Sequence, residues 1–293
     1  MEILDGKKLS QQIKEEIKQA VSLRKEKGQK IPHLAAVLVG NDGASLTYVG
    51  SKVRSCEQVG FQSTLIRLES SITEQALLAK IHELNRDDSL DGYIVQLPLP
   101  KHIDEEKILL AVDPQKDVDG FHPSNFGRMA LEMDAFIPAT PFGIMEMLRR
   151  NQIDVSGKHC VVIGRSHIVG RPISILMSQK GQPGNATVTL AHSRTKNLTQ
   201  LTQKADIIVS ALGIPEFLKA DMVKEGVIVI DVGITRVKDE SHPKGYVIKG
   251  DVAFEEVARK SSFITPVPGG VGPMTIAMLL QNTLISCQRK SKD

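Results

Sequence analysis

Hydrophobic and polar positions along this chain fall into two patterns, one typical of amphipathic helices and one typical of buried strands. Apolar side chains recur every three to four positions over residues 5–27 and predict a helix that ends near Gly28. The continuous apolar run 33–39 predicts a buried strand, and the polar, glycine-bounded segment 40–43 predicts the turn that closes it.

The same patterns continue through most of the chain. Helices are expected at 45–59 (N-cap Ser45, stop Gly60), 73–85, 142–151 and 170–180, and strands at 61–68, 92–97, 159–163, 186–191, 206–210 and 227–231. Strands separated by helices predict parallel pairing. We therefore predict an α/β fold with two units around a cleft, joined by a loop-rich segment. Residues 1–140 and a C-terminal helix at 274–293 form the first, and 141–273 form the second, a doubly wound parallel sheet.

Composition narrows the class of protein. With 41% hydrophobic and 24% charged residues among 293, the chain is typical of soluble globular proteins. Its net charge of +3 is small and interspersed, which argues against a nucleic-acid partner. No apolar run reaches the ~20 residues that span a bilayer, and the N-terminus lacks the apolar core of a secretory signal. The 3 cysteines lie far apart and predict a reducing cytoplasm, with no disulfide or metal framework.

A glycine-bounded loop in the second unit indicates a dinucleotide site. The loop Gly164–Gly170 follows a predicted strand and precedes Pro172, which suits the first turn of a helix. The two glycines allow a sharp turn and a phosphate near the helix N-terminus. Arg165 and Ser166 depart from the Gly-x-Gly-x-x-Gly pattern, so the loop alone is more typical of a structural turn than of a nucleotide site.

The end of the next strand bears on the choice of cofactor. Ser193 and Arg194 stand where an NAD enzyme usually places an acidic residue on the ribose. Together with Arg165, these hydroxyl and guanidinium groups favour a 2′-phosphate and therefore NADP over NAD. Each charge taken alone is also compatible with an ordinary solvated loop. The strand ends at 210–213 and 231–234 belong to the same predicted ligand-binding edge.

Polar residues of the first unit could carry proton chemistry. Tyr48 and Lys52 are four apart and share a helix face, while Gln96 ends an apolar strand. A lysine in such a setting could have its pKa lowered toward neutrality and act as a proton donor and acceptor. Asp119 could accept hydrogen bonds from a ligand's amino groups. Singly, these residues are also compatible with a surface lysine, a half-buried tyrosine and a turn-forming aspartate.

The segment Thr265–Thr275 is rich in proline and glycine, carries no charge, and runs into an apolar helical pattern. Its backbone is shaped by these residues, either as a rigid interdomain turn or as a wall against a ligand. Main-chain N–H groups near 274–277 would face whatever the segment encloses.

Tyr-x-x-x-Lys beside a nucleotide loop also raises the short-chain dehydrogenase/reductase type. In that type the nucleotide unit comes first, whereas here Tyr48 and Lys52 precede the loop at Gly164. The order argues against this alternative.

Several motifs together resemble the bifunctional methylenetetrahydrofolate dehydrogenase/cyclohydrolase family across nearly the whole chain. The matching segments are Tyr48–Lys52, Val95–Leu99, Lys116–Gly120, Pro141–Gly143, Gly164–Ser166 with Val169–Gly170, and Thr265–Thr275. One departure is Ala139, where many relatives have a cysteine, which implies that no thiol chemistry is needed there.

The resemblance implies a Rossmann-like second unit and a two-step reaction. Methylene-tetrahydrofolate is oxidised with NADP to the methenyl cation, which is then hydrolysed to 10-formyl-tetrahydrofolate. Lys52 would move the protons, with Gln96 orienting it, Tyr48 stacking on the folate and Asp119 binding the pterin. The implied folate residues are Tyr48, Lys52, Val95, Gln96, Leu97, Asp119, Pro268, Gly269 and Gly270, the last three opposite Lys52; the implied NADP residues are Gly164, Arg165, Ser166, Ser193 and Ile234.

Two alternatives stay open on sequence alone. One is a monofunctional NADP-dependent dehydrogenase with an idle lysine, and the other is a non-catalytic nucleotide-binding regulator. The family resemblance also implies a homodimer.

The choice of NADP can be tested by steady-state kinetics. We expect a higher kcat/KM for methylene-tetrahydrofolate oxidation with NADP than with NAD, because Arg165 and Ser193 suit a 2′-phosphate. A higher value with NAD would contradict this interpretation of the two residues.

Overall fold

The computed structural model describes residues 1–243 and 245–290 and divides into two compact α/β units. Unit 1 comprises Met1–Ser10 and Thr140–Thr275, and unit 2 comprises Gln11–Ala139 and Ile276–Asp293. Across the described residues, none of the helices combines the length and apolar composition needed to cross a membrane.

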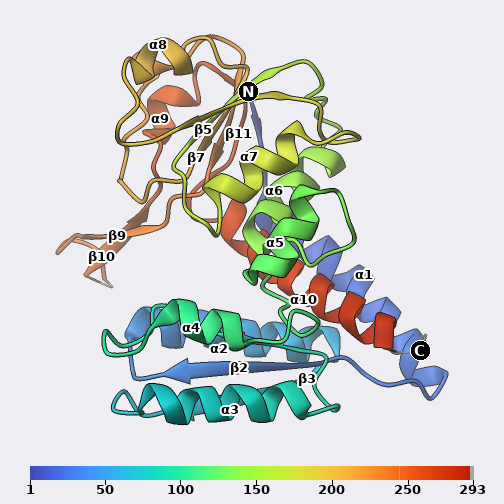
Figure 1. The fold of residues 1–293 in the computed structure, drawn as a ribbon. Helices are drawn as coiled ribbons and strands as arrows, with labels where there is room; N and C mark the ends of the chain where they lie inside the picture. The colour runs from blue at the N-terminus through green and yellow to red at the C-terminus, as the bar shows by residue number, and fades with distance from the viewer. Residues whose placement is uncertain (244, 291–293) are drawn as a thin grey trace. The chain divides into compact units, whose positions relative to one another are not determined.

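Unit 2 is built on a small parallel sheet in the order β3-β2-β4 (Figure 1). Its strands are β2 (His33–Val39), β3 (Gln62–Leu68) and β4 (Gly92–Val95), and its helices are α2 (Gly43–Val59), α3 (Glu74–Arg86), α4 (Glu105–Ala111) and α5 (Pro123–Ala130), with α1 (Gly6–Glu26) and α10 (Val271–Lys290) contributing most of their length. Figure 1 shows α2 and α3 on opposite sides of β2. Buried residues of β2, β4, α3 and α4 form one core cluster beneath the sheet.

Side-chain hydrogen bonds link the strands at the amino-terminal edge of this sheet, and we call the Asp91, His33 and Thr64 group that makes them a clamp. The Asp91 carboxylate, which is buried before β4, accepts from the main-chain N–H of His33 at 2.9 Å and from Lys30 Nζ at 2.7 Å. The His33 ring in turn bonds Thr64 Oγ1 on β3 at 2.8 Å. Asp91 and His33 together thus link the amino-terminal parts of β2, β3 and β4.

Unit 1 contains a larger parallel sheet in the order β1-β11-β8-β7-β5-β6. Its elements are β1 (Glu2–Ile3), α6 (Ala139–Arg150), β5 (His159–Ile163), α7 (Gly170–Ser178), β6 (Thr187–Ala191), α8 (Leu198–Thr202), β7 (Ile207–Ser210), η1 (Ala220–Met222), β8 (Val227–Asp231), α9 (Phe254–Val257) and β11 (Ser261–Ile264), with β9 (Thr235–Lys238) and β10 (Tyr246–Lys249) as a separate antiparallel pair. Figure 1 shows α7 and α9 on opposite sides of the sheet. The predicted α/β class and the parallel second sheet are confirmed.

The amino-terminal edge of the larger sheet carries the same kind of clamp. The Asp206 carboxylate, before β7, accepts from the main-chain N–H of His159 at 2.8 Å and from Lys224 Nζ at 2.5 Å. The His159 ring bonds Thr189 Oγ1 on β6 at 2.9 Å. Both sheets therefore fix their strand starts with an aspartate, a histidine and a threonine.

The carboxyl-terminal edge of the larger sheet contains a switch point in the chain's course. The chain passes from β5 to its neighbour β6 and then crosses to β7 on the other side of β5. Open parallel sheets bind ligands at such a point, outside the carboxyl ends of the strands. The loops after β5 and β7 therefore frame the place where unit 1 can hold a ligand.

Two predicted boundaries differ from the structure. The sequence pattern predicts that residues 1–140 belong to one domain, which corresponds to unit 2. In the structure, β1 pairs in parallel with β11, which places residues 1–10 in unit 1 with Thr140–Thr275. The last helix was expected from residue 274, whereas α10 begins at Val271, with Pro273 in its first turn. Proline is tolerated there because the first helical N–H groups have no intrahelical acceptor.

Local capping explains the other differences. Asp42, rather than Ser45, caps α2, because its carboxylate accepts from both the main-chain N–H and the hydroxyl of Ser45 at 2.8 Å. Gly60 ends that helix in the left-handed region, at φ 81°, as expected. The segment predicted as loop contains α5, whose start is marked by the N-cap His122 and by Pro123.

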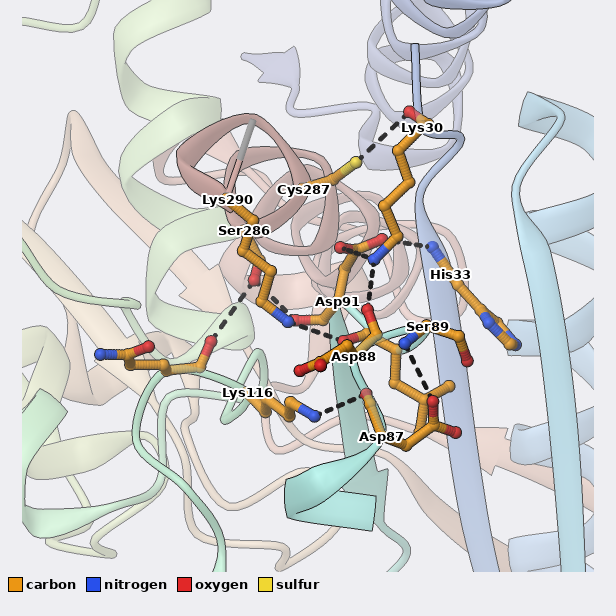
Figure 2. A network of polar contacts seen from close by, with 12 residues as sticks. Lys30, His33, Asp87, Asp88, Ser89, Asp91, Lys116, Ser286, Cys287 and Lys290 are labelled. Carbon is orange, nitrogen blue, oxygen red and sulfur yellow. Dashed lines mark hydrogen bonds and ion pairs between the residues drawn. The ribbon is translucent and has the colours of Figure 1, made fainter. Parts of the chain in front are cut away.

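The carboxyl-terminal part of α10 is anchored within unit 2 by buried polar contacts. Ser286 Oγ donates to the Asp91 carbonyl at 2.6 Å, and Lys290 Nζ donates to the Leu90 carbonyl at 2.7 Å (Figure 2). One helical turn earlier, Asn282 Nδ2 donates to the carbonyls of Val118 at 2.9 Å and Ile137 at 3.0 Å. The helix therefore holds both the start of β4 and the loop that contains Val118.

Asn282→Ala should lower the free energy of unfolding by about 2 kcal/mol, because the buried carbonyl of Val118 and the partly buried carbonyl of Ile137 lose their donor. Urea denaturation of the two proteins measures this difference. Gln288→Ala removes an exposed amide from the same helix and should change the free energy by less than about 0.5 kcal/mol. Equal losses in both variants would contradict a specific role for Asn282.

Candidate active site

Lys52 is the centre of the polar group predicted in the first half of the chain, which lies in unit 2 of the structure. It lies on α2 and is only 5% exposed, which is unusual for a lysine. Its Nζ donates to Gln96 Oε1 at 3.3 Å and lies 4.5 Å from the centre of the Tyr48 ring. The structure thus brings Tyr48 and Lys52 together, as their spacing on one helix predicted, and places Gln96 beside Lys52.

Gln96 presents its carbonyl oxygen to Lys52 because its other groups are already engaged. It follows β4, and its main-chain N–H donates to the Val37 carbonyl at 2.9 Å. Its side-chain Nε2 donates to the Leu97 carbonyl at 2.7 Å. The amide is therefore fixed with an acceptor toward Lys52, a geometry that suits either an ammonium group or a neutral amine.

Burial sets the ionisation of this cluster. Desolvation lowers the pKa of Lys52, and the negative charge of Asp119 partly opposes that shift. Desolvation also raises the pKa of Asp119, with Lys52 opposing in turn. Tyr48 has a raised pKa, mainly because of burial and secondarily because of Asp119, so its hydroxyl stays protonated at neutral pH. Asp119 therefore belongs electrostatically to the same cluster as Lys52.

The loop that carries Asp119 is held by residues that sequence reasoning missed. The buried Asp117 carboxylate accepts from the main-chain N–H of His122 at 2.8 Å and from Asn125 Nδ2 at 2.9 Å. Desolvation raises the pKa of Asp117 to about 6 despite these bonds. Gly120 has φ 74°, and a Cβ there would lie 2.6 Å from Pro138 N. The Asp-x-Asp-Gly spacing is thus a structural requirement of the loop as well as a source of Asp119.

The two strand-end residues beside Gln96 differ in environment. Val95 is 5% exposed and packs into the core cluster beneath the sheet. Leu97 is half-buried and precedes Pro98 through a cis peptide bond. Of these two predicted substrate residues, Leu97 is the more accessible.

The glycines of the loop after β5 meet the requirements of a close turn. Gly164 has φ 114°, and a Cβ there would lie 2.2 Å from the Ala211 carbonyl oxygen at the end of β7. A Cβ at Gly170 would lie 2.0 Å from the Gly164 carbonyl oxygen. Ser166 Oγ accepts from the N–H groups of Val169 and Gly170, both at 3.2 Å. The Ser166 hydroxyl therefore holds the loop against the main-chain N–H groups at the start of α7.

The cationic residues predicted for the cofactor lie at neighbouring strand ends. Gly164 N–H donates to the Ala191 carbonyl at 2.9 Å, which places the loop after β5 beside the turn after β6. Arg165 and Ser166 are exposed on the loop after β5, and Ser193 and Arg194 are exposed on the turn after β6. This glycine turn, flanked by hydroxyl and guanidinium groups, fits a phosphorylated dinucleotide.

The segment rich in proline and glycine lines a small cavity of about 130 Å³ within unit 1. Ile234, which is 61% exposed, belongs to the same wall as Pro268, Gly269 and Gly270. The predicted folate residues therefore fall into two groups. Those around Lys52 lie in unit 2, and Pro268 to Gly270 lie in unit 1 with the predicted cofactor residues.

Comparisons with known proteins agree with this organisation. The catalytic domain of tetrahydrofolate dehydrogenase/cyclohydrolase matches residues 4–119, and the NAD(P)-binding domain of the same family matches residues 138–291. The bifunctional protein FolD of Flavobacterium johnsoniae is 73% identical over 291 residues, covering 99% of each chain.

Solved structures give the same result. The bifunctional FolD methylenetetrahydrofolate dehydrogenase/cyclohydrolase of Campylobacter jejuni superposes with a TM-score of 0.93 at 50% identity, covering 99% of each chain. The Trypanosoma brucei enzyme, solved with NADP cofactor and inhibitor, has a TM-score of 0.93 at 36% identity, covering 99% of this chain and 98% of that one.

A catalytic domain joined to an NAD(P)-binding domain defines a two-domain dehydrogenase. The chain belongs to the tetrahydrofolate dehydrogenase/cyclohydrolase family. The family resemblance predicted from the motifs is thereby confirmed.

The charge coupling between Lys52 and Asp119 can be tested by titration. Asp119→Asn should lower the pKa of Lys52 further, because the carboxylate that favours the ammonium form is lost. NMR of ¹³C-labelled lysine side chains would follow the titration, with the Lys52 signal assigned by its loss in Lys52→Met. Asp88→Asn, an exposed change elsewhere in unit 2, should leave that pKa unchanged. A Lys52 that titrates like an exposed lysine would contradict the description of the site.

Proposed function

We propose that this chain oxidises 5,10-methylene-tetrahydrofolate with NADP and then hydrolyses the methenyl product to 10-formyl-tetrahydrofolate, with Lys52 as the acid–base group of the second step. The observation that carries the proposal is a lysine 5% exposed, bound to an amide oxygen, packed on an aromatic ring and lowered in pKa. Burial favours the neutral amine of such a lysine, and a neutral amine can accept a proton.

The oxidation needs alignment more than acid–base help. The reacting carbon is flanked by two nitrogens, so the cation that forms is resonance-stabilised. NADP, when bound, supplies the acceptor for the hydride. The residues that would hold it are Gly164, Arg165, Ser166, Ser193 and Ile234, which all lie on the loops at the carboxyl-terminal edge of the larger sheet. The protein's contribution to this step is to hold both reactants in line.

The hydrolysis needs a base and then an acid. As neutral amine, Lys52 would take a proton from the water that attacks the methenyl carbon. The bond from that carbon to the ring nitrogen then breaks, and the Lys52 ammonium returns the proton to the departing nitrogen. The second proton of the water leaves to solvent as the carbon–oxygen bond becomes the formyl carbonyl, so the reaction of the cation releases one proton overall. Gln96 keeps the amine oriented through its fixed carbonyl oxygen, and Asp119 offsets part of the cost of the buried ammonium.

Tyr48 and Asp119 have a second proposed role in binding the folate. The Tyr48 ring offers an aromatic face, and Asp119 offers a carboxylate to the amino groups of the pterin edge. Because Asp119 also acts on Lys52, substrate binding at this carboxylate would alter the pKa of the lysine. Binding and proton transfer are thus coupled through one side chain.

Selectivity for NADP is proposed from the charges around the glycine turn. Arg165 and Arg194 are exposed at neighbouring strand ends, and Ser193 is exposed next to Arg194. Guanidinium and hydroxyl groups bind a 2′-phosphate well.

We infer from the family resemblance that the enzyme is a homodimer. We also infer a cytoplasmic location, and the buried Cys56, Cys160 and Cys287, which form no disulfide among the described residues, are compatible with a reducing compartment.

Lys52→Met should lower cyclohydrolase kcat by at least about a hundredfold, because general acid–base catalysis typically contributes that much, while NADP affinity stays close to wild type. The decay of methenyl-tetrahydrofolate absorbance without NADP measures the hydrolysis directly. Arg54→Met removes an exposed cation from the same helix and should leave the rate unchanged. Wild-type hydrolysis by Lys52→Met would refute the proposed role, and a wild-type enzyme that oxidises but does not hydrolyse would be a monofunctional dehydrogenase.

A further inference from the structure

Two buried carboxylates lie together at the carboxyl-terminal edge of the larger sheet, and the proposed reaction uses neither. Asp231 ends β8 and is 3% exposed, and Asp251 follows β10 and is 0% exposed. Isolated buried carboxylates are costly, so their hydrogen-bond partners indicate what they do.

Asp251 binds the loop that follows β7. Its carboxylate accepts from the main-chain N–H of Leu212 at 2.6 Å and of Ile214 at 2.9 Å, and from Ser210 Oγ at 3.4 Å. Each carboxylate oxygen therefore faces a main-chain donor from one short segment. This segment adjoins Ala211, whose carbonyl packs against Gly164 in the predicted cofactor loop.

Asp231 binds the loop that follows its own strand and links it to Asp251. Its carboxylate accepts from the main-chain N–H of Gly233 at 2.9 Å, Asp251 at 2.9 Å and Val252 at 3.0 Å. The Asp231 main-chain N–H donates to Thr265 Oγ1 at 2.7 Å, at the start of the segment rich in proline and glycine.

Glycines make room for both carboxylates. A Cβ at Gly233 would lie 2.2 Å from Asp251 Oδ1, and a Cβ at Gly250 would lie 2.0 Å from Asp231 Oδ2. The close approach of carboxylates to backbone is therefore built into the sequence on both sides. The two loops that these carboxylates shape carry the exposed residues Ile214 and Ile234, and Asp231 itself lines the cavity beside Pro268.

Because the two carboxylates lie close together, the hydrogen bonds that Asp231 accepts are expected to depend on pH. Burial and the nearby charge of Asp251 raise the pKa of Asp231 to about 6, although its hydrogen bonds oppose the shift. Asp251 is the charged group that acts on Asp231 in this way, while Lys249 on the adjoining strand is paired with Glu216 at 2.8 Å. As pH falls through about 6, Asp231 gains a proton and one of its oxygens becomes a poorer acceptor for the main-chain N–H groups.

We propose that Asp231 and Asp251 form a carboxylate brace that holds the loops after β7 and β8 in the shape that binds the nicotinamide cofactor. Both are positioning residues, since they act through the main chain of residues 212–214 and 233–234. This inference rests on the proposed function, because it assumes that NADP binds at this edge of the sheet.

Calorimetric titration of the whole enzyme with NADP and with NADPH tests the brace. Asp251→Asn places an amide N–H against a main-chain donor and should raise both Kd values about tenfold or more. Gly233→Ala displaces the same carboxylate from the opposite side and should have the same effect. Methenyl-tetrahydrofolate hydrolysis without NADP should stay near wild type in both variants, which verifies that unit 2 is intact.

A matched control separates the brace from general stability. Asp206→Asn also removes a carboxylate that accepts a main-chain N–H in this sheet, but at the amino-terminal edge. It should lower the melting temperature and leave the Kd for NADP unchanged. A rise in Kd equal to that of Asp251→Asn would overturn the brace, as would wild-type Kd values in both Asp251→Asn and Gly233→Ala.

The pH dependence provides an independent readout. Lowering the pH from about 7.5 to 5.5 should weaken NADP binding more in wild type than in Asp231→Asn, because only wild type loses the charged acceptor. The cofactor's own phosphate titrates in the same range and contributes equally to both proteins. Identical pH profiles would count against Asp231 as part of the brace. Failure of wild type to bind NADP at any pH would instead overturn the proposed function.

Discussion

Main-chain groups at the ends of parallel strands must find partners, and in this protein aspartate side chains supply several of them. Loops that leave such strands cannot continue the ladder, and an unpaired buried N–H costs as much as a lost hydrogen bond. Asp91 and Asp206 satisfy the starts of strands, while Asp117, Asp231 and Asp251 satisfy the loops that leave them. The positions of Asp119, the cofactor loops and the cavity beside Pro268 all follow from these contacts.

The same burial that gives the loops their shape gives the proposed active site its chemistry. Lys52 is withdrawn from water by α2 and faces an amide and an aromatic ring, so its ammonium form is disfavoured. Asp119 limits the shift, because a charge of opposite sign favours the ammonium form. The balance between desolvation and a single nearby carboxylate therefore sets the proton affinity of the lysine. Gln96 orients the lysine, because its own amide nitrogen donates to the Leu97 carbonyl and its amide oxygen therefore faces Lys52.

Much of the fold was predictable from the sequence because its signals are local. The strand at 33–39, the stop at Gly60 and the parallel order all follow from apolar runs and glycine positions. Helix α5 was missed because it is short, although His122 and Pro123 mark its start. Tyr48, Lys52 and Gln96 were found through spacing and a strand end. Asp251 was not found, because its partners are main-chain groups some forty residues earlier, and only the adjacent Gly250 hints at the close approach.

The Asp–His–Thr clamp at the amino-terminal edge of each sheet indicates that the two units share one arrangement of strands and helices. In both units an aspartate before the third strand binds a histidine that opens the central strand, and that histidine binds a threonine on the second. The strand orders β3-β2-β4 and β6-β5-β7 are equivalent, so α2 and α7 occupy the same position in two copies of one plan. The helix that carries Lys52 in one copy is the counterpart of the helix beneath the glycine loop in the other. A single β–α–β–α–β design thus serves twice within this chain, with the proposed proton chemistry on a helix in one copy and the proposed nucleotide site on the loops at the strand ends in the other.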